Sequence, residues 1–330
     1  DVSAAIGGSS APITHGVVPS GNGGAVIIDG NAVVYAETTL DNSFTGNYSG
    51  AAIGQGCMSW LDWEIKIGGS ADVKAYAGPT GAGIGSSFGY SKAKLSIEIG
   101  ASAEVIAYAG QYGAGIGTSY NSWHYTQNFT TISISGNADV TAVGGPYTGG
   151  AGIGSGYGDH SGNITITDEA RVTAAGGPGA SAIGAGASGM VAGTTTITAG
   201  TYVEAYADGT KFAIDISKTS TGAVNVSDTV LNGRFATDAN PPADDDDEPS
   251  TIYLLKDGEI DSTLTLPDNY RSFAVTASDG KGVIKVQNAA NESQYAYYLD
   301  DNNAKQIVYP LYDTLDDENY EMLTKDNLRW

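Results

Sequence analysis

Apolar and polar residues alternate along short stretches of this chain, and the stretches recur. Residues 65–78 are IKIGGSADVKAYAG, residues 97–110 are IEIGASAEVIAYAG, residues 132–145 are ISISGNADVTAVGG and residues 164–177 are ITITDEARVTAAGG. Alternation with a period of two is the pattern of a strand that buries one face. Each unit therefore predicts two strands separated by a corner, such as the one at Gly68 and Gly69, where glycine turns the chain at little steric cost.

Three apolar positions recur in fixed order with a period of about 30 residues, which is the sign of a repeat architecture. The first column is Ile at 28, 67, 99, 134, 166 and 197, the second is Val at 34, 73, 105, 140, 172 and 203, and the third is Ile at 53, 84, 116, 153 and 183. A single unit of this size encloses no core, whereas stacked units bury a continuous interior. The pattern predicts a parallel β-helix of seven coils, right-handed because crossovers between parallel strands have that hand.

The repeat defines the expected domains. Residues 1–236 form the β-helix, and residues 4–8, AAIGG, match the closing element of a unit whose first two strands are missing, so we expect an N-terminally truncated fragment of a longer protein. Residues 237–250 are an acidic, Pro-containing loop or linker. Residues 251–330 hold six short strand patterns separated by turn residues, which predict a small antiparallel β domain or a cap on the open end.

The linker contains a run of consecutive carboxylates. These are Asp244, Asp245, Asp246 and Asp247, followed by Glu248. Such a run is expected to be solvated and to hold no ligand, so no cofactor is predicted. A Ca²⁺ site is the alternative, although neighbouring carboxylates on one extended segment point in opposite directions and need further ligands.

The charge of the chain bounds its partners and setting. A formal net charge of −22, with 15 Lys and Arg, excludes nucleic acid and argues against an anionic membrane surface. The single cysteine, Cys57, rules out a disulfide framework, and no Cys/His spacing indicates zinc. No apolar stretch is long enough to span a bilayer. The composition is typical of extracellular repeat proteins on bacterial surfaces.

The repeat also carries a resemblance. The AGIG element after an I-x-I-x-G-x-A-x-V-x-A double strand resembles the β-helical repeats of large surface proteins from gut Firmicutes, over about residues 1–236. That family implies an adhesin, or a binder of carbohydrate or host glycoprotein. Fold alone does not carry chemistry, since β-helices also house polysaccharide lyases and glycosidases.

One outward column of the second strand is acidic. It contains Asp72, Glu104 and Asp139, followed by Arg171 and Tyr202. Carboxylates one coil apart can act as a glycosidase pair or share a Ca²⁺ ion, which would make the chain a polysaccharide-active enzyme. The other interpretation is a solvated charge column that Lys74 and Arg171 partly balance.

Aromatic residues supply the candidate binding sites. Tyr76 and Tyr108 lie in the neighbouring outward column with Val143, Ala175 and Tyr206, and they either offer a contact surface or stabilise each other. The insertions after each AxIG element emerge at one corner. They carry Trp60, Trp63, Tyr90, Trp123, His124, Tyr125, Tyr157 and His160, which either form a binding edge or cover the flank of the solenoid.

These observations predict a non-enzymatic binding module of the bacterial cell surface, an adhesin whose partner is a glycan or a host glycoprotein. The enzyme based on Asp72, Glu104 and Asp139 is one alternative. A surface protein that binds immunoglobulin or another host protein is a second, because Tyr- and Trp-rich surfaces suit protein partners equally well.

Overall fold

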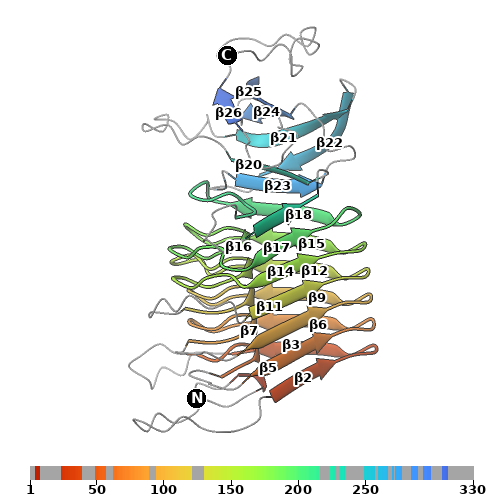
Figure 1. The fold of residues 1–330 in the computed structure, drawn as a ribbon, viewed down its shortest axis with the longest axis vertical. Coiled ribbons are helices and arrows are strands. Elements are labelled where there is room, and N and C mark those ends of the chain that lie inside the picture. The colour runs from red at the N-terminus through yellow and green to blue at the C-terminus, as the bar shows by residue number, and fades with distance from the viewer. Residues whose placement is uncertain are drawn as a thin grey trace.

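The protein is a stack of β-coils capped by a further β-sheet (Figure 1). This computed structural model describes residues 4–7, 24–38, 49–56, 62–88, 94–120, 130–215, 223–227, 230–234, 249–256, 259–266, 270, 272–276, 284–288, 293–298 and 307–310. Within these ranges there is no helix, and each coil of about 32 residues gives one strand to each of three parallel sheets. The predicted parallel β-helix is confirmed. Its right-handed sense stays a prediction.

The three solenoid sheets, A, B and C, each collect one strand type. Sheet A contains β1 (Ile6–Gly7), β4 (Ile53–Gly54), β7 (Ile84–Gly85), β10 (Ile116–Gly117), β13 (Ile153–Gly154) and β16 (Ile183–Gly184). Sheet B contains β2 (Gly24–Ile28), β5 (Trp63–Ile67), β8 (Leu95–Ile99), β11 (Thr130–Ile134), β14 (Asn163–Ile166), β17 (Thr194–Ile197) and β19 (Ala223–Val226). Sheet C contains β3 (Val33–Glu37), β6 (Asp72–Tyr76), β9 (Glu104–Tyr108), β12 (Asp139–Val143), β15 (Arg171–Ala175) and β18 (Tyr202–Ala207), and then β23 (Ser272–Thr276) and β20 (Val230–Arg234).

The number of coils differs from the expectation of seven. Among the described residues, five coils have all three strands, from β2–β4 to β14–β16. β1 alone represents a coil before them. After them, β17 and β18 are followed by a single parallel bridge between Ile183 and Ile214. The last AxIG element is missing there because Asp215 stands where the earlier coils have glycine.

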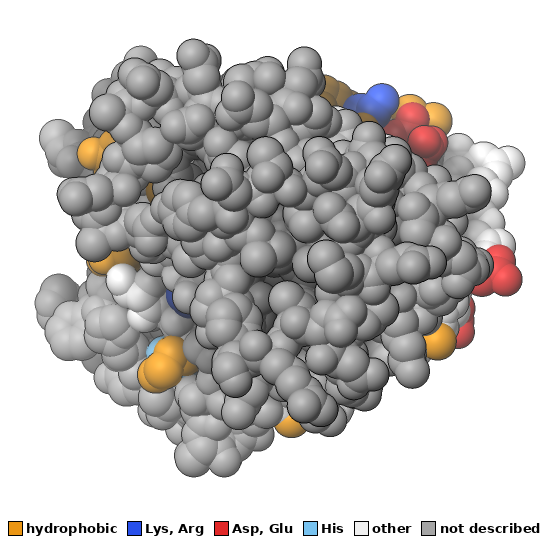
Figure 2. Space-filling model, turned by 90° about the horizontal axis from the view of Figure 1, so that it is seen from above, with side chains coloured by type: hydrophobic (Ala, Val, Ile, Leu, Met, Phe, Trp, Pro, Cys, Tyr) orange, Lys and Arg blue, Asp and Glu red, His pale blue; other side chains and the backbone are white. Residues whose placement is uncertain are grey.

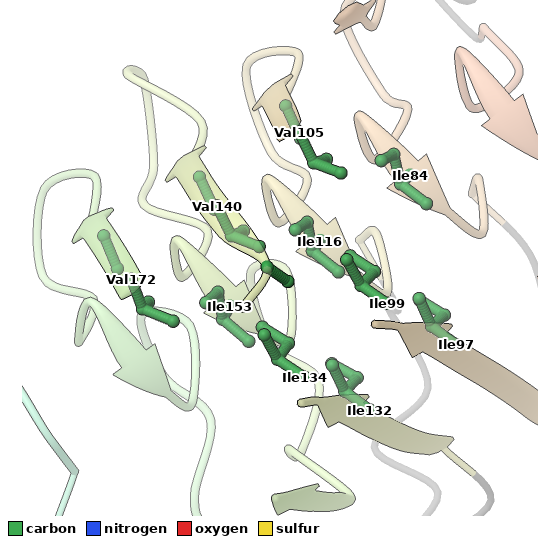
Figure 3. Packing of buried hydrophobic residues seen from close by; sticks show 14 of the residues in the cluster. Ile84, Ile97, Ile99, Val105, Ile116, Ile132, Ile134, Val140, Ile153 and Val172 are labelled. Carbon is green, nitrogen blue, oxygen red and sulfur yellow. The ribbon is translucent and has the colours of Figure 1, made fainter. Parts of the chain in front are cut away.

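The predicted columns form the core. Val105, Val140 and Val172 come from sheet C, Ile116 and Ile153 come from sheet A, and all point into one interior (Figure 3). Each is at most 1% exposed. The partners are in register along the stack, so each side chain packs on its equivalent from the next coil. The interior is therefore a set of apolar ladders, with the alanine column beside the valines.

The closing Ile-Gly strands bring backbone against backbone. Gly85 has φ +141°, and a Cβ added there would lie 1.8 Å from the carbonyl oxygen of Gly117 in the next coil. Gly54, Gly117 and Gly154 repeat this contact at 2.1, 1.9 and 1.9 Å. No other residue fits, so the glycine of the AxIG element follows directly from the stacking of sheet A.

The C-terminal part of the chain closes the solenoid. β23 pairs antiparallel with β18, from Glu204 opposite Val275 to Ala207 opposite Ser272, and β20 pairs antiparallel with the other edge of β23. The series of parallel strands in sheet C therefore ends at an antiparallel strand, which lies about 70 residues further along the chain. This strand protects the edge that a parallel sheet would otherwise expose.

Two side chains make the backbone hydrogen bonds that the strands of a further coil would otherwise make. The amide of Asn232 accepts from Ile214 N at 3.1 Å and donates to Ile214 O at 2.9 Å. Thr276 Oγ1 accepts from Val203 N at 2.9 Å and donates to Thr201 O at 3.1 Å. Both side chains thus mimic a neighbouring peptide unit and satisfy backbone groups at the end of the ladder.

The remaining strands form a separate antiparallel sheet beyond this cap (Figure 1). Its order is β22 (Glu259–Thr265), β21 (Pro249–Lys256), β24 (Ile284–Asn288), β25 (Ser293–Tyr298) and β26 (Ile307–Pro310). The six strand patterns found in residues 251–330 thus divide between this sheet and β23 in the solenoid. No helix in the described ranges is long and apolar enough to cross a membrane.

Replacing Gly85 by Ala tests the backbone contact. We expect a loss of at least about 3 kcal/mol in the free energy of unfolding, because the new methyl group collides with the Gly117 carbonyl and the φ angle is unfavourable. Gly30→Ala is the matched control, since Gly30 has φ +70° but no atom within 4 Å of the added Cβ. It should cost about 1 kcal/mol. Equal losses in chemical denaturation would contradict the stacking argument.

Replacing Asn232 by Ala tests the cap. The change leaves the buried amide and carbonyl of Ile214 without these partners, and we expect a loss of about 2 to 4 kcal/mol. Asn225→Ala, at an exposed position of β19, should change stability by less than about 0.5 kcal/mol. A thermal or urea transition that moves equally little in both variants would show that Asn232 does not hold the end of the solenoid.

Candidate functional site

Three tyrosines form a row on the outer face of sheet C, here called the tyrosine row. It consists of Tyr35, Tyr76 and Tyr108. The valines and alanines of these strands point inward, so the alternate residues project to solvent. The rings of Tyr76 and Tyr108 are 5.3 Å apart between centroids with an interplanar angle of 9°, and Tyr35 lies 5.4 Å from Tyr76 at 38°.

The stacking geometry decides which parts of these rings a partner can reach. Nearly parallel rings at this separation are offset-stacked, so Tyr76 and Tyr108 turn part of their faces toward each other. Free faces remain at the two ends of the row, where Tyr35 is 65% and Tyr108 39% exposed. The ring contact on which the predicted mutual stabilisation depends is therefore present, and the row still leaves aromatic surface in solvent.

The outward column of Tyr76 and Tyr108, in which Glu37 and not Tyr35 is the register partner of Tyr76, is covered at its other end. Tyr206 is in register with Ala175 but only 6% exposed, because Tyr270 lies over it with ring centroids 6.0 Å apart. Its hydroxyl donates to Glu204. Burial, together with this carboxylate, raises the pKa of Tyr206 well above its usual range. Tyr206 therefore keeps the outward register position expected for it, but it offers no contact surface there because Tyr270 packs over its ring.

The acidic column lies on the same sheet. Asp72, Glu104 and Asp139 occupy neighbouring register positions in β6, β9 and β12. Lys74 is 3.9 Å from Asp72, and the guanidinium of Arg171 continues the column 4.6 Å above the ring of Tyr202. The acidic side chains visible along the solenoid axis lie on one side of the molecule (Figure 2). Lys74 and Arg171 therefore lie beside the carboxylates, as expected if the column is a solvated and partly balanced row of charges.

Metal ligands do not gather in the described part of the chain. No three side chains of His, Cys, Asp or Glu lie close enough there to hold an ion. The candidate calcium ligands Asp244, Asp245, Asp246 and Asp247 lie outside the described residues.

The predicted aromatic edge is only partly within the described ranges. Trp60, Tyr90, Trp123, His124 and Tyr125 lie outside them.

Trp63 lies in β5 and not in the insertion before it. Its ring fills the space over Gly24, where an added Cβ would be 2.6 Å from two ring atoms, and it packs against the hydrophobic core. Trp63 therefore covers the flank of the solenoid, which was the second of the two interpretations that the sequence allowed.

His160 also has a structural neighbour in the next coil. Its Nδ1 accepts from the backbone N of Met190 at 3.3 Å, and its own backbone N donates to Asp159 Oδ1 at 2.9 Å. The imidazole thus joins two stacked loops.

A second stack, the loop aromatic row, was missed by the sequence analysis except for Tyr157. Phe88 stacks on Tyr120 at 5.3 Å and Tyr120 on Tyr157 at 5.6 Å, while Tyr112 and Tyr147 lie beside it. Each member of the row stands four positions after the isoleucine of its AxIG element. That fixed offset was the signal that could have found it.

A shallow hollow of about 330 Å³ lies at the corner where sheet B turns into sheet C. Its polar lining comes from Asp29, Lys66, Glu98, Ser133 and Ser135, and Ile27 forms an apolar wall. Lys66 Nζ is 2.8 Å from Glu64 and 3.7 Å from Glu98. The hydrogen bond to Glu64 raises the pKa of Lys66, so its ammonium stays charged at neutral pH. Sequence analysis did not predict this hollow.

Comparison of the chain with protein-family models, with curated proteins and with solved structures finds no match. The assignment of a function therefore depends on the surfaces described above.

A double-mutant cycle on Tyr76 and Tyr108 measures their stacking. Replacing each and both by Ala should give a coupling free energy of about 0.5 to 1.5 kcal/mol, as for other aromatic pairs. Thr141 and Thr173 are the comparison pair, because they are register neighbours on the same face without rings, and their coupling should be smaller than that of the tyrosines. A coupling free energy near zero for Tyr76 and Tyr108 would show that the tyrosine rings do not stabilise each other.

Proposed function

We propose that the protein is a non-enzymatic binding module of the bacterial cell surface, an extracellular adhesin that recognises a glycan or a host glycoprotein. The observation that supports this proposal is the tyrosine row, in which neighbouring rings, exposed at Tyr35 and Tyr108, stand on strands that pair in regular register. Exposing aromatic area to water is unfavourable, and it is typical of contact surfaces. Tyrosine also supplies a large contact area with few rotatable bonds.

The scaffold suits such a role. Each ring of the tyrosine row projects from a strand that is hydrogen-bonded to at least one neighbouring strand, and the interior beneath the row is closely packed. A surface held in this way loses little conformational entropy when a partner binds. The free ring faces of Tyr35 and Tyr108 at the ends of the row are the places where a pyranose ring would stack.

A protein partner, such as an immunoglobulin, is the second candidate. It is supported by the continuity of apolar groups on sheet C, where Ile106 projects beside Tyr108 and Val143 follows Tyr108 in register. Interfaces between proteins have such apolar centres with polar surroundings, and Asp72, Glu104 and Lys74 provide the polar surroundings here.

Binding of the purified chain to a glycan array, together with capture of proteins from mucosal secretions, tests this function. Replacing Tyr76 and Tyr108 together by Ser should weaken binding to the ligands found by at least tenfold, about 1.4 kcal/mol. Thr141→Ser with Thr173→Ser on the same face is the control and should leave binding unchanged. Absence of any glycan or host-protein ligand for the wild-type chain would refute the proposal.

A second variant locates the contact if the tyrosine row is not responsible. Trp123→Ala with Tyr125→Ala changes the insertion that the sequence analysis favoured, at residues outside the described ranges. Loss of binding in this variant alone would move the contact to the loop edge. Full binding in both variants would place the contact on another part of the chain, either elsewhere on the solenoid or on the C-terminal sheet.

A further inference from the structure

The hollow at the corner between sheets B and C has a specific cause in the sequence. The same corner position is occupied by Asp29, Gly68, Gly100, Ser135 and Thr167 in successive coils, each amide from Gly68 onward donating to the strand end of the coil before it. Gly68 and Gly100 have no side chain, whereas Asp29 and Ser135 on either side do. The hollow is the space over these two glycines, and all four residues from Asp29 to Ser135 line it.

The polar groups around this space indicate the chemistry of a ligand. Asp29 and Glu98 offer carboxylate acceptors, and the one ammonium in the lining, Lys66, already interacts with Glu64 and Glu98. Ser133 and Ser135 add hydroxyl groups that both donate and accept. A ligand rich in hydroxyl donors fits this lining. An anion does not, because the carboxylates and the chain's net charge of −22 repel it.

The apolar wall completes the description. Ile27 is 69% exposed and lines the hollow, although the residues in register with it in the next coils are Lys66 and Glu98. A pyranose has hydroxyl groups around its rim and C–H groups on its faces. It can therefore direct its rim to Asp29 and Glu98 while a face contacts Ile27, as small-molecule sites combine apolar walls with a few placed polar groups.

A strained residue lies in the same place. The position after the corner is left-handed in the five complete coils, with φ of +70° at Gly30, +64° at Gly69, +55° at Ala101, +66° at Gly136 and +61° at Asp168. The left-handed backbone of Asp168 has an explanation, since the carboxylate of this residue accepts a hydrogen bond from Gly136 N at 3.0 Å. Ala101 has no polar side-chain group to compensate for the strain, and it lines the hollow. Backbone strain of this kind often accompanies binding sites.

We propose that this hollow is a subsite for one neutral pyranose unit. The inference rests on the proposed glycan-binding function and deepens it by adding a site on a different face from the tyrosine row. Asp29 and Glu98 would accept hydrogen bonds from the sugar hydroxyls. Lys66, Ser133 and Ser135 would donate to its oxygens, and Ile27 and Ala101 would contact its C–H face.

Saturation-transfer NMR on the whole chain measures whether it binds a neutral pyranose, and the substitutions below assign that binding to the hollow. The probes are the methyl β-glycosides of glucose, galactose and N-acetylglucosamine, with methyl glucuronide as the anionic comparator and butylamine as the cationic one. We expect transfer to at least one neutral glycoside and none to the glucuronide. Transfer to butylamine but to no neutral glycoside would overturn the proposal, because the hollow would then be a cation site.

Two substitutions separate the hollow from the rest of the surface. Gly68→Leu fills it without backbone strain, because Gly68 does not have a positive φ and the nearest atom to an added Cβ is Asp29 Oδ1 at 3.4 Å. Binding of the neutral glycoside should fall at least tenfold. Thr167→Leu places the same side chain at the equivalent corner outside the hollow and should leave binding unchanged.

Ala101→Gly gives two readouts of opposite sign. Removing the strained Cβ should raise the melting temperature, whereas loss of one methyl contact should weaken glycoside binding by about fourfold. A higher melting temperature with unchanged binding, or unchanged binding in Gly68→Leu, would overturn the subsite. Glycan-array binding that still depends on Tyr76 and Tyr108 would in that case leave the proposed function standing, whereas a wild-type chain without any ligand would remove both.

Discussion

Contact between the backbones of successive coils is the constraint on which this structure depends. At the AxIG strands the carbonyl of one coil occupies the place where a side chain on the coil before it would begin, with 1.8–2.1 Å between that oxygen and an ideal Cβ at Gly54, Gly85, Gly117 and Gly154. Only glycine meets this condition. Because each coil must repeat the same path to keep the contact, the sequence must repeat as well, and the isoleucine, valine and alanine columns follow as the ladders that fill the interior.

This constraint separates structural from variable positions. Inward residues of each strand are held by packing on the equivalent residue of the next coil, so they vary little between units. Outward residues have no such restriction, and sheet C accordingly carries tyrosine, lysine, carboxylates and threonine at equivalent outward positions. On such a scaffold, the residues available for binding lie in the outward columns and at the corner turns, where neighbouring side chains come from different coils. The tyrosine row and the corner hollow are both of this kind.

The end of the solenoid shows how the ladder stops without leaving polar groups unsatisfied. β23 closes sheet C as an antiparallel strand, while the side chains of Asn232 and Thr276 pair with backbone groups of the last coil. Lys211 donates to the carbonyls of Gly186 and Gly189 at 2.8 and 2.7 Å and lies 3.4 Å from the buried carboxylate of Asp215. Burial lowers the pKa of Lys211, and these acceptors surround its ammonium. The antiparallel strand and these side chains each replace contacts that a further coil would provide.

The sequence by itself determined the coil, its three strands, the inward columns and which residues of sheet C share an outward column, because a period-two pattern that recurs with the same apolar positions in every unit allows only one register for parallel stacking. Only the tertiary structure decided that Tyr206 is covered, that Trp63 packs over Gly24, and that β23 enters sheet C. These outcomes depend on contacts between segments that do not share the repeat, or on the direction of a large side chain at a coil edge. A local periodic pattern contains no information about either, since both are settled by the shape of the space that neighbouring coils leave open.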